Sequence, residues 1–514
     1  MHDVNWTALA IFTALFGCIS WLGFAAARWR RGDLDQLHEW GLGGRRFGTV
    51  ITWFLVGGDI YTAYTFIAVP ALAFGAGAVA FFAVPYTIII YPLLFLVFRR
   101  LWHVSHKHGY ITAGDFVRGR FGNRWLALAI SVTGIAATMP YIALQLVGIQ
   151  VILGALGIAG SGLAADLPLL LAFLVLAGFT YSSGLRAPAS IAVVKDILIY
   201  ATALAAVIVI PAQLGGFAKI FAAVPAHRLL LAAPGPHSTG AYSGYATLAL
   251  GSALALFLYP HSLTGILSAS SGHAIRRNAA LLPGYTFMLG LLALLGFFVI
   301  AAGVDKMPQY AAGFRQFGNN FAVPALLLHS FPAWFVGIAF AAIGIGALVP
   351  AAIMSIAAAN LCSRNIYREF INKNPTDKQE SRIAKLVSLI VKAGALAFIL
   401  FVPTQYAIQL QLLGGIWIIQ TLPAVICGAY TRWFHSWALL VGWAVGTSTG
   451  TWMAIASKLT PTFPLAIGGY SFPGYTAVYT VVLNLLVAAA LTPVFQAAGV
   501  RRGPDETAAA DYVA

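Results

Sequence analysis

The chain has 514 residues, of which 60% are hydrophobic and only 9% are charged, and its formal net charge at pH 7 is +15. A soluble domain carries roughly a quarter charged residues, so a chain with a mean hydropathy of +0.84 cannot cover itself with a wetted surface. In hydrocarbon only helices and closed barrels satisfy every backbone hydrogen bond internally.

The apolar runs are continuous and about twenty residues or more in length, which predicts membrane-spanning helices rather than the short alternating strands of a barrel. The first run begins almost at once and lacks a basic leader, so we interpret it as a retained span and not a signal peptide. We therefore predict an all-α membrane protein with about thirteen spans, at residues 4–27, 48–74, 77–98, 125–157, 167–185, 190–212, 244–270, 280–303, 332–362, 384–402, 412–430, 437–457 and 474–497.

The positive charge is distributed as an orientation signal and not as a nucleic-acid-binding surface. Of the 30 Lys and Arg residues, 25 fall on segments that the thirteen-span order places on one side of the membrane. The positive-inside rule assigns that side to the cytoplasm. This predicts an outside N-terminus and a cytoplasmic C-terminus in an inner membrane, with lipids rather than nucleic acid as partners. Three scattered cysteines indicate neither a disulfide framework nor a zinc site.

Two predicted spans are interrupted by residues that weaken a helix. The second span carries Gly57 and Gly58 at its middle, and the seventh carries Pro260. A glycine pair costs about 2 kcal/mol relative to alanine, and proline removes a backbone hydrogen bond. Two broken helices five spans apart are typical of secondary transporters built from inverted repeats, whose solute site lies near the midplane.

Asp59 is the first candidate for a functional residue. It follows the glycine pair near the middle of the second span, where a carboxylate costs at least about 2.5 kcal/mol on insertion scales. The sequence favours a carboxylate that binds a cation or a substrate over a structural one that accepts hydrogen bonds from hydroxyls of a neighbouring helix.

Other mid-span polar residues are candidates to contact a small amphipathic solute. Each of them is also explained by a hydrogen bond between helices, and the histidine is equally consistent with a packed core residue. Asp196 either pairs with the adjacent Lys195, which we favour, or lies on the path of a coupling ion. The solute-binding candidates, together with Asp59, are Tyr61, Thr62, Tyr64, Thr65, Gln145, Tyr259, His261 and Ser262.

The histidine cluster His103, His106 and His108 lies in a basic segment without an acidic or cysteine ligand, which favours a solvated loop over a metal site. The chain contains no GxSxG, HExxH or P-loop motif. A hydrolase or an ATP-driven pump is therefore not supported, and we expect no enzyme activity and no cofactor besides a coupling cation, H⁺ or Na⁺.

Several segments resemble the sodium:solute symporter family over nearly the whole chain. They are LGGRRFG (42–48), GDIYTAYTF (58–66), SGLR (183–186) ahead of Lys195 and Asp196, AAIMS (351–355) and SRNIY (363–367). Within that family, the Gly-Asp pair and the run FLYPHSLTG (257–265) are most similar to the acetate and monocarboxylate permeases.

The resemblance implies a leucine-transporter-like fold of five plus five helices in a single domain, 1–514. The inverted repeats would occupy 48–212 and 244–430, with accessory helices at 4–27 and 437–497 and a cytoplasmic tail at 498–514. It also implies a sodium site between the second and ninth spans. The corresponding ligands here are the carbonyls of Gly57, Ile60 and Ala352 and the hydroxyl of Ser355, with Asp59 and Asp196 as further coupling-ion candidates.

Ile356 departs from the family pattern. The family carries a second hydroxyl at this position, and isoleucine can donate no oxygen to a cation. The sequence therefore favours proton over sodium coupling, with Asp59 as the group that takes up the proton.

We predict a symporter that imports short monocarboxylates such as pyruvate, lactate, acetate or propionate. The alternatives are a sodium-coupled symporter of an amino acid or another polar solute and, in a different class, a membrane sensor or a channel. The sequence leaves the oligomeric state open.

Overall fold

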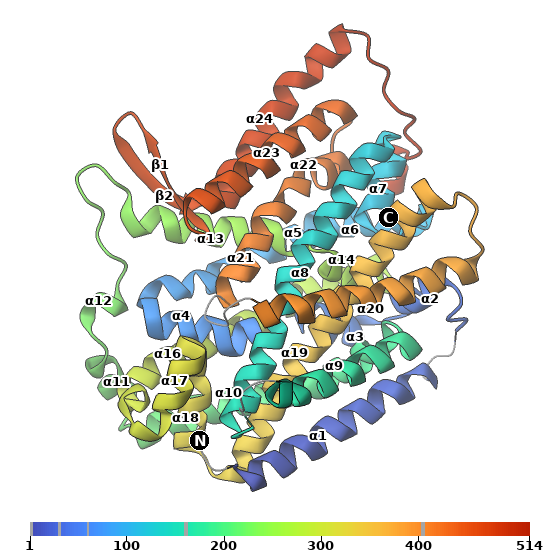
Figure 1. Cartoon of the computed structure of the whole chain (residues 1–514). Helices are drawn as coiled ribbons and strands as arrows, with labels where there is room; N and C mark the ends of the chain where they lie inside the picture. Colours follow the sequence, from blue (N-terminus) through green and yellow to red (C-terminus); the bar gives the residue numbers. More distant parts are fainter. Residues whose placement is uncertain (1–3, 29–31, 59–60, 159–162, 402–406, 514) are drawn as a thin grey trace.

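The computed structural model describes residues 4–28, 32–58, 61–158, 163–401 and 407–513, which fold as one bundle of helices (Figure 1). The helices of the first half are α1 (Trp6–Ala25), α2 (Leu37–Leu42), α3 (Thr49–Gly57), α4 (Val69–Ala76), α5 (Ala83–Leu93), α6 (Arg99–His108), α7 (Ala113–Phe121), α8 (Arg124–Ala155), α9 (Leu163–Ser183), α10 (Arg186–Gln213), α11 (Phe217–Ala223) and α12 (Ala226–Leu229). Those of the second half are α13 (Gly240–Leu256), α14 (Pro260–Leu267), α15 (Gly272–Leu281), α16 (Pro283–Ala302), α17 (Ala311–Phe317), α18 (Ala322–Ser330), α19 (Ala333–Leu361), α20 (Asp377–Phe401), α21 (Ala407–Ile418), α22 (Leu422–Val425), α23 (Ser436–Ala456) and α24 (Thr476–Ala497).

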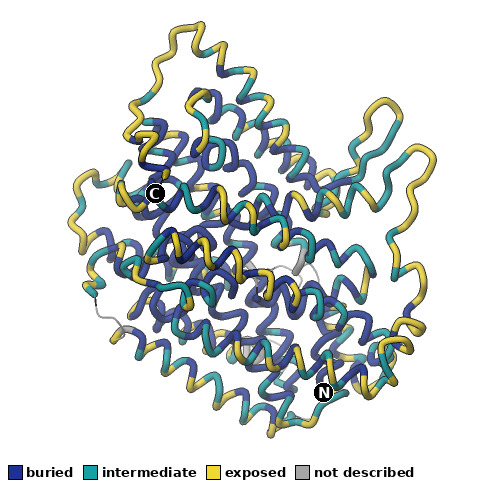
Figure 2. The backbone as a smooth tube through the Cα atoms, turned by 180° about the vertical axis from the view of Figure 1, so that it is seen from behind, coloured by how far each residue is buried: buried dark blue, intermediate teal, exposed yellow. Residues whose placement is uncertain are grey.

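Helix α19 is the centre of the bundle. All of its residues from 339 to 361 are buried, and it packs against α1, α8, α10 and α20. Its sequence is rich in alanine and glycine, and small residues let neighbouring helices approach closely within a membrane. The exposed residues lie on the outer helices and loops (Figure 2). Among them are large apolar side chains such as Trp21 of α1 and Leu486 of α24, as expected for a surface in contact with lipid.

Both predicted helix breaks are present. Helix α3 ends at Gly57, and helical structure resumes as a π-helix at Tyr64–Ala68 before α4. Helices α13 and α14 meet at a 50° bend just ahead of Pro260. At the first break, a Cβ atom on Gly57 would collide with the ring of Tyr285. The glycine is therefore required for the close approach of α16 as well as for the break itself.

Among the described residues, fewer helices are long enough to cross a membrane than the thirteen spans that the sequence predicts. Within the described ranges, nine helices are long and apolar enough to cross a membrane, or ten if the bent pair α13–α14 counts as one span. The pieces of the first broken helix are individually short, and α20 begins with charged residues. The count of thirteen spans remains a prediction.

The sequence did not predict the antiparallel hairpin of β1 (Thr462–Ile467) and β2 (Tyr470–Tyr475), which joins α23 to α24. Its turn places Gly468 and Gly469 at φ values of 58° and 78°, as two-residue hairpin turns require. Strand β2 packs on α13, where Ser243 Oγ donates to the carbonyl of Pro473 at 2.6 Å. The two loops around 213–243 and 304–331 form the short helices α11, α12, α17 and α18.

Candidate functional site

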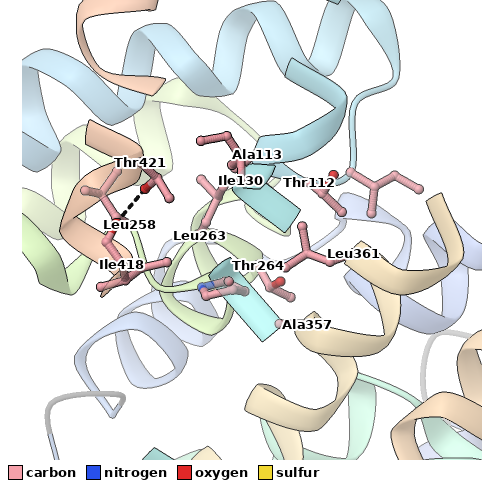
Figure 3. Close-up of a pocket in the computed structure, with 13 residues that line it drawn as sticks. Thr112, Ala113, Ile130, Leu258, Leu263, Thr264, Ala357, Leu361, Ile418 and Thr421 are labelled. Atoms are coloured by element: carbon pink, nitrogen blue, oxygen red, sulfur yellow. Dashed lines mark hydrogen bonds between the residues drawn. The ribbon is translucent and has the colours of Figure 1, made fainter. Parts of the chain in front are cut away.

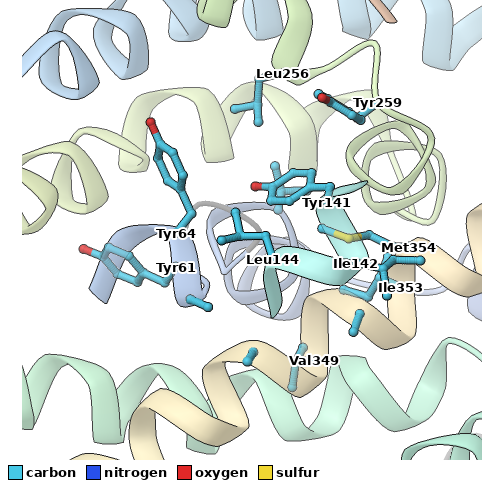
Figure 4. Packing of buried hydrophobic residues seen from close by; sticks show 14 of the residues in the cluster. Tyr61, Tyr64, Tyr141, Ile142, Leu144, Leu256, Tyr259, Val349, Ile353 and Met354 are labelled. Atoms are coloured by element: carbon cyan, nitrogen blue, oxygen red, sulfur yellow. The ribbon is translucent and has the colours of Figure 1, made fainter. Parts of the chain in front are cut away.

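The two broken helices meet beside α8 and α19: α14 packs directly on α3, and both α8 and α19 contact α14. Figure 4 shows the buried side chains that meet there, from the first break (Tyr61, Tyr64), α8 (Tyr141, Ile142, Leu144), the second break (Leu256, Tyr259) and α19 (Val349, Ile353, Met354). The candidates Gly57, Thr62, Thr65, Gln145, His261, Ser262, Asp196, Ala352 and Ser355 are likewise buried. Asp59 and Ile60 lie outside the described residues.

Gln145 supports the first broken helix. Its side-chain oxygen accepts a hydrogen bond from the backbone N–H of Ala63 at 3.1 Å, and its side-chain nitrogen donates to the carbonyl of Tyr141 at 3.4 Å. Where a helix is interrupted, backbone groups lose their intrahelical partners. The side chain from α8 replaces one of those partners. The hydrogen bond between helices that the sequence allowed for Gln145 is therefore present, and its contact with a solute remains a prediction.

Aromatic and charged groups surround the other side of this break. The hydroxyl of Tyr61 donates to the carbonyl of Tyr285 at 3.0 Å, and the two rings pack with centroids 4.6 Å apart. The hydroxyl of Tyr285 donates to Asp196 at 2.6 Å. The second carboxylate oxygen of Asp196 lies 3.0 Å from Nζ of Lys195, and both side chains are fully buried. The predicted Lys195–Asp196 pair is therefore present.

The ammonium of Lys195 extends to the broken helix itself. It donates to the carbonyl of Gly58 at 2.6 Å and to that of Tyr61 at 3.1 Å. These carbonyls each lie one residue beyond the predicted sodium ligands Gly57 and Ile60. The sequence placed Lys195 only beside Asp196, because its contact with α3 depends on how α10 packs against that helix.

The second break is lined by rings. Tyr259, which directly precedes Pro260, donates its hydroxyl to the carbonyl of Gln411 at 3.1 Å. The His261 ring lies 5.3 Å from that of Tyr259 and 5.2 Å from that of Tyr141 on α8. His261 is thus enclosed by aromatic neighbours at the start of α14.

Two of the remaining predicted sodium ligands are hydrogen-bonded to each other on α19. The hydroxyl of Ser355 donates to the carbonyl of Ala352 at 2.8 Å, and both oxygens keep lone pairs that are available to a cation. Ser388 of α20 lies 3.3 Å from the Ser355 hydroxyl and accepts a hydrogen bond from Nζ of Lys392 at 2.7 Å. Lys392 is fully buried. The sequence reasoning missed Ser388 and Lys392, although a lysine in the middle of an apolar span is itself a signal.

A narrow cavity of about 10 Å³ lies between α7, α8, α14 and α19 (Figure 3). Its polar lining is Thr112, Thr264 and Thr421, and the other lining residues are apolar. Such a volume holds about one water molecule. This conformation therefore leaves no room there for an organic solute to pass.

The histidine cluster, expected in a solvated loop, lies within helix α6 (Arg99–His108), so the prediction of a loop was wrong. His108 contacts Asp511 in the C-terminal tail at 2.7 Å, and Lys107 contacts the same carboxylate at 2.5 Å. No group of three metal-ligating side chains occurs in the part of the chain that the structure describes.

Comparisons with known proteins identify the family. The sequence profile of the sodium:solute symporter family matches residues 40–432. The chain belongs to the sodium:solute symporter family. It is therefore a multi-pass membrane transporter and not an enzyme, and its family implies a coupling cation.

Two relatives of this symporter match almost end to end. The chain is 52% identical over 494 residues to a monocarboxylate transport permease protein of Rhizobium johnstonii, covering 95% of this chain and 96% of the relative. It is 32% identical over 497 residues to the uncharacterized symporter YodF of Bacillus subtilis, with 96% and 94% covered.

The fold is also found in a solved structure. A substrate-bound, outward-open Na⁺-coupled sialic acid symporter superposes with a TM-score of 0.74 at 16% identity, covering 95% of this chain and 98% of that one. The predicted leucine-transporter-like fold is confirmed.

Proposed function

We propose that this symporter imports short-chain monocarboxylates, such as pyruvate, lactate, acetate and propionate, across the inner membrane. The observation that supports this substrate class best is the 52% identity, over nearly the full length of both chains, to a protein named as a monocarboxylate transport permease. The proposed orientation has the N-terminus outside and the tail in the cytoplasm, as the distribution of Lys and Arg predicts.

We place the substrate between the two breaks, with 48–212 and 244–430 as the inverted repeats. The candidate contacts are those predicted from the sequence, Asp59 and the buried polar residues of the two breaks. At the second break, α14 starts at Pro260, directly beside Tyr259 and His261. The positive end of a half-helix attracts an anionic group, so we propose that the substrate carboxylate lies at this helix start.

The coupling cation in this proposal is a proton. Isoleucine at position 356 is fully buried and supplies no oxygen, so Ser355 provides the one hydroxyl of the pair 355–356. A hard cation needs several oxygen ligands, and this pair offers few. One proton carried with one monocarboxylate moves no net charge, so the proton concentration gradient and not the membrane potential supplies the driving force for accumulation of the solute.

The substrate class is tested by uptake of labelled pyruvate into proteoliposomes, with unlabelled competitors on the outside. Lactate, acetate and propionate are expected to compete, whereas neutral amino acids are not. Competition by amino acids without competition by monocarboxylates would favour the alternative of an amino-acid symporter. Accumulation above the external concentration separates a symporter from a channel.

Ile356→Thr tests the coupling ion separately, because it restores the hydroxyl that the family pattern carries at this position. The variant is expected to acquire or strengthen a sodium dependence of uptake. Val349→Thr on the same helix is the control, since it adds a hydroxyl at a buried position two turns away. An unchanged sodium response in Ile356→Thr would place the ion elsewhere.

A further inference from the structure

Lys195 is held by two hydrogen bonds and one ion pair. Three oxygens surround its Nζ atom. They are the carbonyl of Gly58 at 2.6 Å, Asp196 Oδ1 at 3.0 Å and the carbonyl of Tyr61 at 3.1 Å. The side chain has no exposed surface, so water does not compete for these donors.

These three oxygens are the kind of ligands that a bare alkali cation would use. Two are main-chain carbonyls on either side of the interruption between α3 and the π-helix, and the third is a carboxylate. Asp196 is held in place by the hydroxyl of Tyr285 at 2.6 Å, and Tyr285 in turn packs directly on Gly57. The ammonium thus supplies one positive charge at the centre of a prepared oxygen cluster.

The α19 side of the expected sodium site lies near a second buried lysine. Nζ of Lys392 lies 2.7 Å from Oγ of Ser388, which in turn lies 3.3 Å from Oγ of Ser355. Within the described ranges, no carboxylate lies within 4.0 Å of Lys392. Like charges repel strongly where water is excluded, so a sodium ion at the first break would meet the positive charge of Lys195, which α10 supplies. The residues present do not fit the sodium ion that the family implies.

We propose that Lys195 is a tethered cation that takes the place of sodium at the first broken helix. Its ammonium neutralises Asp196 and ties the two ends of the break together through Gly58 and Tyr61. The site therefore accepts an alkylammonium group and excludes free sodium. This inference deepens the proposed absence of sodium coupling, but it does not depend on which solute is carried.

Sodium binding to the purified protein tests the proposal without any substrate. The midpoint of thermal unfolding is measured in detergent at constant ionic strength, with sodium chloride replacing choline chloride up to 200 mM. The wild type is expected to show no difference between the two salts. Lys195→Ala leaves the carboxylate and both carbonyls without their cation, so we expect sodium to raise its midpoint by about 2 °C or more, because a ligand that binds only the folded state stabilises it.

Lys392→Ala is the matched control, because it removes a second fully buried lysine that has no neighbouring carboxylate. It is expected to remain indifferent to sodium. A sodium response in Lys392→Ala but not in Lys195→Ala would overturn the proposal. So would sodium-dependent stabilisation of the wild type.

Equilibrium binding of ²²Na⁺ to the wild type keeps the proposal testable if Lys195→Ala does not fold. No saturable binding is expected, and saturable binding would contradict the tethered cation. Because none of these measurements uses pyruvate, a failure to transport monocarboxylates would leave their outcome unchanged. The two proposals can therefore fail separately.

Discussion

Replacing Gln145 with methionine tests whether this side chain holds the first broken helix in place. Methionine has a similar length and volume, so the packing change is small, but it offers no oxygen to the N–H of Ala63. In the structure that N–H donates to the Gln145 side chain at 3.1 Å in a buried environment. A buried donor left without a partner costs about 1–3 kcal/mol.

We expect Gln145→Met to lower the free energy of unfolding by about 1–3 kcal/mol, measured by denaturant titration in detergent micelles. Gln150→Met is the control on the same helix, because the side-chain oxygen of Gln150 has no hydrogen-bond partner among the described residues. The control should lose less than about 0.5 kcal/mol. Equal losses in the two variants, or no loss in Gln145→Met, would refute the role assigned to Gln145.

Three further predictions concern other charged groups. Arg186→Met should destabilise the protein by about 1.5–3 kcal/mol, because the buried carboxylate of Glu39 loses its contact with Arg186 and keeps the one with Arg46 at 2.9 Å; adding Glu39→Leu should recover part of the loss, and no recovery would argue against a charge effect. Asp511→Asn should release the C-terminal tail and increase its cleavage by protease. The backbone N–H of Ala508 and hydrogen bonds from Lys107 and His108 hold the pKa of Asp511 well below its usual range, so its contribution is present above the unfolded pKa of about 4 and is lost only as the pH falls through the lower folded value. Asp59→Asn should abolish accumulation without loss of the protein from the membrane, and gradient-driven uptake by a well-expressed variant would reduce Asp59 to a structural residue.

Much of the architecture could be predicted because membrane helices are marked by local sequence features. Hydropathy predicted the helices, and Gly57, Gly58 and Pro260 indicated both breaks. The pairing of Lys195 with Asp196 was predictable because the two residues are adjacent and buried charges need partners.

The contacts that join different helices could not be predicted in the same way. The reach of Lys195 to Gly58 and Tyr61 depends on how α10 packs on α3, and the packing of Tyr285 on Gly57 depends on α16. Ser388 and Lys392 lie near Ser355 only because α20 packs against α19. Neither periodicity nor composition specifies these neighbours. The hairpin of β1 and β2 was missed because its short strands lie between two long apolar runs that dominate the pattern.

Uptake of labelled pyruvate into proteoliposomes, under separately imposed proton and sodium gradients at a fixed membrane potential, tests most directly whether the protein is a proton-coupled monocarboxylate symporter. We predict that an inward proton gradient drives accumulation, that uptake rises as the external pH falls, and that replacing sodium with choline has no effect. Accumulation that requires a sodium gradient at every pH would contradict both the proposed proton coupling and the assignment of Lys195 as the resident cation.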